Sequence, residues 1–206
     1  MKIVYGTGNK EKLLQMEKII KVNDFDVELF SLKDINFNEE IIEDGETFEE
    51  NSKIKATALR NYCNKNNFNE CIILTDDSGL CVDALNGAPG VYSARYAGDH
   101  APQDVTLNKL MDNLKDFKGA EKRKASFTCV LTASLPDGTY IVSKGETHGH
   151  IKEQIGKLGG LTYEPVFVPE GFDKPISEMS IEEFKKLRNH RVIAMTEIFK
   201  KLKEII

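Results

Sequence analysis

Apolar residues near the start of the chain change from a short continuous run to a helical spacing. Lys2–Tyr5 is apolar after its first residue and ends at Gly6. The next apolar residues recur with a helical period: Leu13, Leu14, Met16, Ile19 and Ile20. This pattern predicts a strand, a glycine turn and a helix. Residues 27–30 predict a second short strand, and the acidic, poorly periodic stretch 33–46 predicts a loop.

Two further helices are marked by their first residues. Thr47 is followed by Glu50, and Ser180 by Glu183, which is the spacing of a capping box. The first box predicts a helix to about Asn64, and the second predicts helical segments that continue to the C-terminus. Pro102 stands where it would start another helix, because the apolar residues after it have helical spacing. These residues are Val105, Leu107, Leu110, Met111 and Leu114.

Alternation of apolar and polar residues is clearest between residues 126 and 135. Pro136-Asp137-Gly138 then predicts a turn into a second strand over 139–144, which makes a long hairpin. Cys71–Thr75 predicts a buried strand that ends at Asp76-Asp77-Ser78-Gly79. Because strands and helices interleave while the hairpin adds antiparallel pairing, we predict an α/β protein with a mixed sheet.

Composition limits the class of protein. The 206 residues suit one domain or two small lobes. With 28 Lys and Arg against 33 Asp and Glu, the net charge is −5, which argues against nonspecific nucleic-acid binding. No apolar run approaches the ~20 residues of a membrane span, and glycines interrupt any apolar export signal. Four cysteines without a C-x-x-C pair are typical of free thiols in the cytoplasm.

The first segment with candidate chemistry joins the first strand to the first helix. Its residues are Thr7, Gly8, Asn9, Lys10, Glu11 and Lys12. Backbone N–H groups at a helix start attract anions, and Lys12 adds a positive charge. The alternative interpretation is an ordinary helix cap with Asn9 at the N-cap position.

The second segment is the pair Asp76-Asp77 after a buried strand. Two carboxylates there suit a hard cation such as Mg²⁺, and one of them can accept a proton from an attacking water. Glu43 in the acidic loop is a candidate second cation ligand. The alternative is a simple Asp-Ser-Gly turn.

The third segment is basic and lies near the C-terminus. His190-Arg191 follows Lys185 and is suited to recognising phosphate or the edge of a base. The alternative is a solvated helical surface. His148 and His150 share one face of a strand, but two histidines without a third ligand favour a structural role over metal binding.

Taken together, these segments resemble one family, the inosine triphosphate pyrophosphatases of the Ham1/RdgB type. The resemblance rests on Thr7-Gly8-Asn9 with Lys12, Glu43 ahead of Thr47–Asn51 with Lys55, the long block Asp76–Gly98, and His190-Arg191. It therefore extends from residue 7 to residue 191. It implies an elongated mixed β-sheet with flanking helices in a single domain over residues 1–206, with two lobes around a central cleft. It also implies a homodimer.

The resemblance implies a hydrolase of nucleotide metabolism. Its substrates would be non-canonical purine nucleoside triphosphates (ITP, dITP and XTP), cleaved to the monophosphate and pyrophosphate with Mg²⁺, or with Mn²⁺ as a substitute. Asp77 would be the proton acceptor, and the metal ligands would be Glu43, Asp76 and Asp77. The nucleotide would be bound by Thr7, Gly8, Asn9, Lys10, Glu11, Lys12, Lys55, Ser78, Leu161, Thr162, Tyr163, Glu164, Lys185, His190 and Arg191.

The chain departs from the family pattern in the segment expected to recognise the base. Family members carry Gly-Gly-Phe-Gly-Tyr-Asp-Pro, whereas this chain has Gly-Gly-Leu-Thr-Tyr-Glu-Pro over residues 159–165. Leu161 therefore replaces an aromatic residue, Glu164 replaces aspartate, and Asn189 stands where serine is usual. Two alternatives follow. One is the same chemistry with a different base preference, and the other is a nucleotide sensor without turnover.

Overall fold

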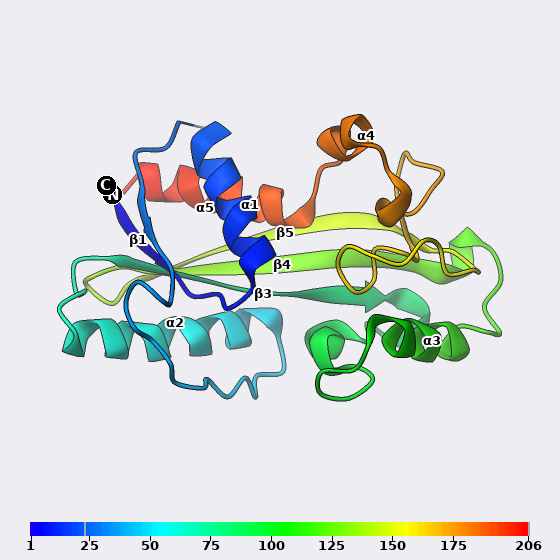
Figure 1. Cartoon of the computed structure of the whole chain (residues 1–206), viewed down its shortest axis with the longest axis horizontal. Helices are drawn as coiled ribbons and strands as arrows, with labels where there is room; N and C mark the ends of the chain where they lie inside the picture. The colour runs from blue at the N-terminus through cyan, green and yellow to red at the C-terminus, as the bar shows by residue number, and fades with distance from the viewer. Residues whose placement is uncertain (23, 206) are drawn as a thin grey trace. The chain divides into compact units, whose positions relative to one another are not determined.

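The structure, a computed structural model, describes residues 1–22 and 24–205. Strands and helices alternate along much of the chain (Figure 1). The strands are β1 (Lys2–Tyr5), β2 (Glu28–Phe30), β3 (Ile72–Val82), β4 (Lys124–Ser134), β5 (Tyr140–Ile151) and β6 (Phe167–Pro169). The α-helices are α1 (Lys10–Val22), α2 (Phe48–Lys65), α3 (Gln103–Asn113), α4 (Ile181–Lys186) and α5 (His190–Lys203). Short 3-10 helices occupy Asp83–Leu85, Gly90–Arg95, Ala120–Arg123 and Ile176–Glu178.

All six strands belong to one sheet, in the order β2-β1-β3-β4-β5-β6. Strand β1 pairs in parallel with both β2 and β3, whereas β5 and β6 are antiparallel. Parallel neighbours need a crossover: α1 lies in the connection from β1 to β2, and α2 lies in the connection from β2 to β3. The predicted α/β class with a mixed sheet is confirmed.

The chain divides into two compact units, and each is described by itself. The first unit comprises Met1–Asp77, Cys129–Gly145 and Arg191–Ile206, and the second comprises Ser78–Thr128 and Glu146–His190. Strands β3, β4 and β5 contribute residues to both units. A single domain with a central cleft stays a prediction.

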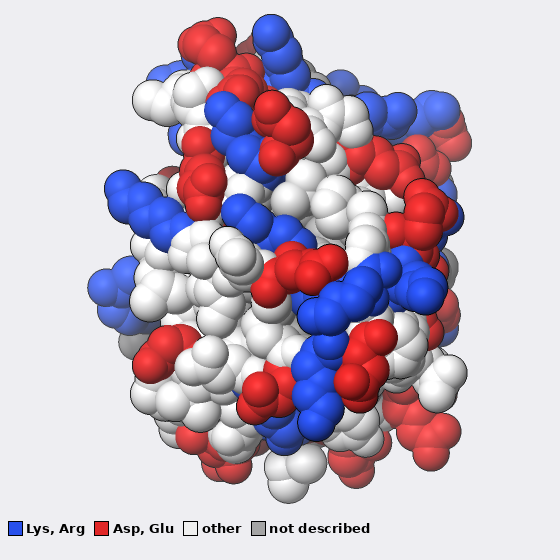
Figure 2. Space-filling model, turned by 90° about the vertical axis from the view of Figure 1, so that its right-hand side faces the viewer, with Lys and Arg blue, Asp and Glu red and all other residues white. Residues whose placement is uncertain are grey.

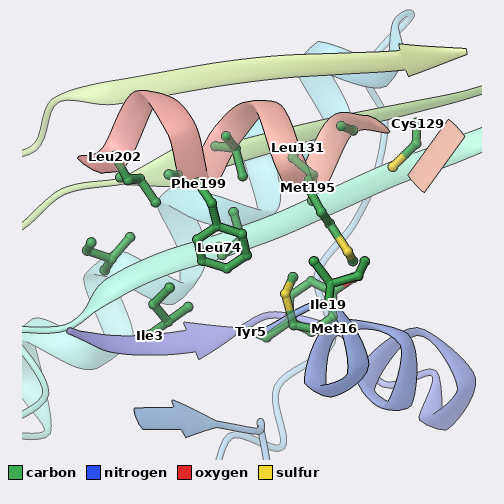
Figure 3. Packing of buried hydrophobic residues seen from close by; sticks show 14 of the residues in the cluster. Ile3, Tyr5, Met16, Ile19, Leu74, Cys129, Leu131, Met195, Phe199 and Leu202 are labelled. Carbon is green, nitrogen blue, oxygen red and sulfur yellow. The ribbon is translucent and has the colours of Figure 1, made fainter. Parts of the chain in front are cut away.

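In the first unit, side chains alternate between the two faces of the sheet. Ile3, Tyr5 and Leu74 pack on one face with α1 and α5, whereas Val4 and Ile73 pack on the other face with α2. Figure 3 shows the first of these cores, where Met195, Phe199 and Leu202 of α5 meet residues of β1, β3 and β4. The two-residue period of a strand thus produces two separate cores.

The second unit has its own core. Leu107, Leu110 and Leu114, in and just after α3, are fully buried against Leu80 and Val82 of β3. The helix predicted after Pro102 is therefore confirmed, with Pro102 as its N-cap residue. Of the predicted apolar residues, Leu107, Leu110 and Leu114 form its buried face, whereas Val105 is exposed.

Most predicted elements are confirmed. Both capping boxes are formed: Thr47 and Ser180 accept the N3 backbone N–H, while Glu50 and Glu183 reach back to the cap. Residues 33–46 contain neither helix nor strand. The hairpin strand is longer than predicted, since β5 continues to Ile151, and β6 was not predicted.

The predicted end of one strand is wrong. The sequence predicts that a strand ends at Thr75 and that a turn begins at Asp76, but β3 continues through both aspartates to Val82. The reason is that β3 lies between β1 and β4 in the sheet, and β4 is as long as β3, so pairing continues after β1 has ended at Tyr5. Leu80 and Val82 are then buried, which favours strand over turn. The simple-turn interpretation of this segment is therefore excluded.

Surface and cysteine properties agree with the expectations from composition. On the face shown in Figure 2, basic and acidic side chains are intermixed, without a large area of one sign. No helix in the described part of the chain is long and apolar enough to cross a membrane. All four cysteines are free thiols, and Cys63, Cys71 and Cys129 are buried.

Candidate active site

The turn between β1 and α1 is fixed by its own polar side chains. The Asn9 carboxamide oxygen accepts hydrogen bonds from the backbone N–H of Glu11 (2.9 Å) and Lys12 (3.4 Å), and the Thr7 hydroxyl accepts one from Asn9 N (3.2 Å). The helix-cap interpretation of Asn9 is thus confirmed. At Gly8 an added Cβ would meet no atom within 4 Å, so the backbone there is open to a ligand. Lys10 and Glu11 are exposed on the first turn.

Lys12 extends from this turn to the buried carboxylate of Asp76. Its Nζ lies 2.5 Å from Asp76 Oδ2, and the hydroxyl of Tyr5 donates to Asp76 Oδ1 at 2.9 Å. The Asp76 side chain is only 1% exposed. A buried charge needs both a counter-charge and hydrogen bonds. Lys12 of α1 supplies the counter-charge to Asp76, and Tyr5 of β1 supplies a hydrogen bond.

Asp77, the next residue of β3, has different neighbours. Lys55 of α2 places its Nζ 2.6 Å from Glu43 Oε2 and 3.6 Å from Asp77 Oδ1. The side chains of Lys55 and Asp77 are 12% and 14% exposed, so this pair is largely removed from water, whereas the Glu43 side chain is 32% exposed. Glu43, which the sequence placed in an acidic loop, thereby lies beside Asp77.

Asn51 holds Asp77 and the loop that carries Glu43 in place. It is not among the site residues that were predicted from the sequence. Its Nδ2 donates to Asp77 Oδ2 at 3.1 Å, while its Oδ1 accepts from the backbone N–H of Gly45 at 2.9 Å. Asn51 thus ties the loop that carries Glu43 to β3. The signal was present, because Asn51 and Lys55 are four residues apart and so share one face of α2.

The two adjacent aspartates differ in their protonation equilibria. Burial alone would raise the pKa of Asp76, but the positive charges of Lys12, Arg191 and Lys55 outweigh it and hold that pKa well below its usual range. For Asp77, burial raises the pKa above its usual value, and the opposing effects of Lys55 and the Asn51 hydrogen bond do not cancel it. Two carboxylates with pKa values pushed apart are suited to different roles.

Lys55 remains a cation in this setting. Burial alone would lower the pKa of its ammonium group, but Asp77, Asp76 and Glu43 together raise the pKa above its usual value. The first unit therefore holds a fixed positive charge beside a carboxylate of raised proton affinity.

His190 and Arg191, in the basic segment near the C-terminus, are buried, so the interpretation of a solvated helical surface is wrong for these two residues. In the first unit, Arg191 donates to Gln15 Oε1 of α1 at 3.1 Å. In the second unit, the ring of His190 stacks on Phe127 with centroids 5.1 Å apart. Both residues are buried and begin α5. Lys185 does lie on an exposed surface, where it pairs with Glu182 at 3.0 Å.

The segment expected to recognise the base lies in the second unit. Tyr163 is buried and its hydroxyl donates to Ser93 O at 2.8 Å, so this side chain anchors the segment. Leu161, Thr162 and Glu164 are half-buried. Ser78 is also half-buried and follows Asp77 directly in β3.

The structure brings together in the first unit the predicted residues Lys12, Glu43, Lys55, Asp76, Asp77 and Arg191. Comparison with known proteins identifies the family of the chain. A model of the Ham1 family matches residues 3–201. The chain belongs to the Ham1 family.

Relatives and solved structures agree with the Ham1 assignment over the whole chain. The chain is 38% identical to a dITP/XTP pyrophosphatase of Clostridium perfringens over 205 residues, covering 100% of this chain and 98% of the relative. It is 36% identical to the dITP/XTP pyrophosphatase of Bacillus subtilis, covering 97% and 96%.

Two solved structures resemble the fold. The Staphylococcus aureus Ham1 protein superposes with a TM-score of 0.84 at 30% identity, covering 100% of both chains. A HAM1 protein from Coxiella burnetii gives 0.84 at 28% identity, covering 99% of both. The predicted family and its mixed-sheet fold are confirmed.

Ham1 proteins are nucleotide pyrophosphatases that generally depend on a metal. Among residues 1–22 and 24–205, no three His, Cys, Asp or Glu side chains are grouped so that they could hold a metal ion. Two carboxylates, Glu43 and Asp77, face a common cation, the Lys55 ammonium. Because Mg²⁺ is commonly held by one or two carboxylates together with substrate phosphates, this pair fits such an ion.

Proposed function

We propose that this chain hydrolyses non-canonical purine nucleoside triphosphates, namely ITP, dITP and XTP, to the monophosphate and pyrophosphate. The observation that carries the proposal is the contrast between the adjacent carboxylates. Asp76 is held as an anion by Lys12, whereas Asp77 has a raised pKa beside Lys55 and Glu43. Membership of the Ham1 family, whose relatives carry the name dITP/XTP pyrophosphatase, gives the substrate class.

In this proposal Asp77 is the proton acceptor. A carboxylate with a raised pKa takes a proton from an attacking water more readily than an ordinary aspartate does. Asn51 holds one carboxylate oxygen by a hydrogen bond, so the group keeps a fixed orientation while it accepts the proton. The departing pyrophosphate is an anion whose negative charge must be neutralised by cations. In the first unit, the candidates for that role are Lys12, Lys55 and Arg191.

Glu43 and Asp77 would hold the metal ion, for which we propose Mg²⁺ with Mn²⁺ as a substitute. Asp76 is the third predicted ligand; its two oxygens already contact Tyr5 and Lys12, so it would coordinate through a remaining lone pair. When bound, the ion would supply positive charge to the phosphate oxygens and orient the triphosphate.

The other predicted residues bind the nucleotide in this proposal. The triphosphate is assigned to Lys55, Ser78 and the β1–α1 turn, whose members are Thr7, Gly8, Asn9, Lys10, Glu11 and Lys12. The base is assigned to the loop residues Leu161, Thr162, Tyr163 and Glu164, and Lys185, His190 and Arg191 belong to the nucleotide site. Support for the phosphate assignment is the open backbone at Gly8 and the positive end of α1.

We also propose a single domain over residues 1–206 that acts as a homodimer in the cytoplasm. The four free thiols support a reducing compartment.

The test is a panel of triphosphates compared by specificity constant for pyrophosphate release with Mg²⁺. We expect ITP, dITP and XTP to exceed ATP and GTP, and chelation of the metal to stop the reaction. Preference for another base would instead support the second candidate, the same chemistry with altered selectivity, which the Leu161 and Glu164 departures allow. Binding without turnover in the presence of Mg²⁺ would contradict the enzyme assignment and support the sensor.

A further inference from the structure

Gln103 is the first residue of α3 and lies against the 159–164 loop, by which we mean residues Gly159–Glu164. Its backbone position is fixed by the start of the helix, since Pro102 is the N-cap residue. Both Gln103 and the loop belong to the second unit, so their contacts are internal to it.

The Gln103 carboxamide uses both of its ends on the loop. Its Nε2 donates towards three carbonyl oxygens, those of Gly159 (3.2 Å), Leu161 (3.2 Å) and Thr162 (3.3 Å). Its Oε1 accepts a hydrogen bond from the backbone N–H of Gly159 at 3.1 Å. One side chain therefore contacts the backbone at both sides of the bend, because a carboxamide has a donor and an acceptor on separate atoms.

The opposite side of the loop is closed by its own residues. Glu164 Oε2 accepts from the backbone N–H of Leu161 at 3.1 Å, and an added Cβ on Gly160 would lie only 2.0 Å from that oxygen. Gly160 also has a φ of +66°, a backbone conformation that favours glycine. The loop is thus bent tightly around Glu164, and Gln103 holds the bend against α3.

We propose that Gln103 is a positioning residue that sets the affinity and selectivity of the 159–164 loop for the purine base; this rests on the proposed function. The loop lacks an aromatic side chain at residue 161, so a base gains no stacking there and depends on the placement of backbone groups. Holding a loop in its binding conformation before the ligand arrives lowers the entropy cost of association. By holding the loop in this conformation, Gln103 therefore contributes affinity for the base that Leu161 does not provide through stacking.

Gln103 does not belong to the hydrophobic core of the second unit. The buried face of α3 is made by Leu107 and Leu110, and Thr106 is buried beside them, whereas Gln103 is only half-buried. Removal of its carboxamide should leave the packing of α3 intact and change the loop alone.

The experiment compares Gln103→Ala and Gln103→Glu with a matched control, Asn108→Ala, at an exposed position of the same helix. For Gln103→Ala we expect KM for ITP to rise about tenfold, the size of a lost hydrogen-bonded clamp, with kcat within about twofold of the original. Gln103→Glu keeps the acceptor for Gly159 N–H but turns a carboxylate oxygen towards three carbonyl oxygens. Its KM should therefore rise at least as much, although its size is unchanged.

Two further readouts distinguish positioning from a general loss of structure. Inhibition by inorganic triphosphate, which has no base, should be unchanged in both variants. Amide hydrogen exchange in the peptide that contains Gly159 and Leu161 should be faster in Gln103→Ala and unchanged in Asn108→Ala. The ratio of specificity constants for ITP and ATP should also fall in both Gln103 variants.

An unchanged KM and an unchanged exchange rate in the Gln103 variants, with ITP still hydrolysed, would overturn the positioning role and leave the proposed function standing. Equal loss of kcat for every triphosphate, with weaker inhibition by inorganic triphosphate, would also overturn it. Failure of the original protein to hydrolyse any triphosphate would instead contradict the proposed function, while faster exchange in Gln103→Ala would still show that Gln103 holds the loop.

Discussion

Each of the two regions assigned to the nucleotide is stabilised internally, and the interactions differ between the two. In the first unit, Lys12, Lys55, Asp76 and Asp77 form charged pairs that are largely buried. In the second unit, the 159–164 loop is held by neutral hydrogen bonds to its backbone, chiefly from Gln103. Buried charges are sensitive to the loss of one partner, whereas exposed backbone groups can turn to water instead.

Because of this difference, we expect the first unit to determine the phosphate chemistry and the 159–164 loop to determine the selectivity for the base. Fixed charges in a region with little water act strongly on a phosphate anion and do not depend on which base the nucleotide carries. A loop closed by weak contacts around two glycines can change its sequence without disturbing those charges. We therefore expect changes in the first unit to affect all substrates alike, and changes in the loop to affect substrates differently.

The largest expected effect comes from Asp77→Asn. Loss of a general base typically lowers a rate by a factor of about 10² to 10⁴, so pyrophosphate release should fall at least about 100-fold for every triphosphate. The fold should remain, because asparagine still offers an oxygen to the Asn51 amide. Steady-state kinetics with a circular dichroism spectrum measure both.

The matched control is Asp112→Asn, at an exposed position of α3. It should retain full activity. Substantial turnover by Asp77→Asn, or loss restricted to one base, would show that the first unit does not carry the common chemistry.

A second effect should appear in stability. Lys12→Met leaves the Asp76 carboxylate buried without its ammonium partner, and breaking one side of such a pair costs about 3–5 kcal/mol in the free energy of unfolding. Adding Asp76→Asn to this variant should recover most of the loss, because the neutral amide oxygen still accepts from Tyr5. Urea denaturation of the two single variants and the double variant measures the coupling.

For comparison, Lys18→Met removes an exposed lysine from the same helix and should change stability by less than about 0.5 kcal/mol. If Lys12→Met is no more destabilising than Lys18→Met, the buried pair does not hold the first unit as described.

The smallest expected effect belongs to the loop. Leu161→Phe offers an aromatic face to the base, and stacking contributes about 1–3 kcal/mol per base. KM for ITP should therefore fall about fivefold or more, while kcat should change little. Leu158→Phe, one residue before the loop and 52% exposed, is the matched control and should leave KM unchanged. Equal effects of the two substitutions would remove the special role of residue 161.

Local signals in the sequence predicted much of the fold. Thr47 with Glu50 and Ser180 with Glu183 mark helix starts because both halves of a capping box lie within four residues. The course of β3 could not be predicted in this way. Asp76 and Asp77 look like a strand end, and only pairing with β4, about fifty residues later, keeps them in the strand.

The same limit applies to the site. Motifs identified Lys12, Asp76 and Asp77, but the hydroxyl of Tyr5 reaches Asp76 across 71 positions of sequence. Gln103 lies 56 positions from Gly159 and has no motif of its own. Side chains that position others are found through contacts, because their residue types vary with the neighbours that they hold.

The most direct test of the central claim is identification of the products of ITP hydrolysis. Purified protein should be incubated with ITP and Mg²⁺, and the nucleotide and phosphate products quantified together. We predict inosine monophosphate and pyrophosphate in equal amounts, with both formed at least about 100-fold more slowly by Asp77→Asn. Inosine diphosphate with orthophosphate, or no hydrolysis by the folded protein, would contradict the account.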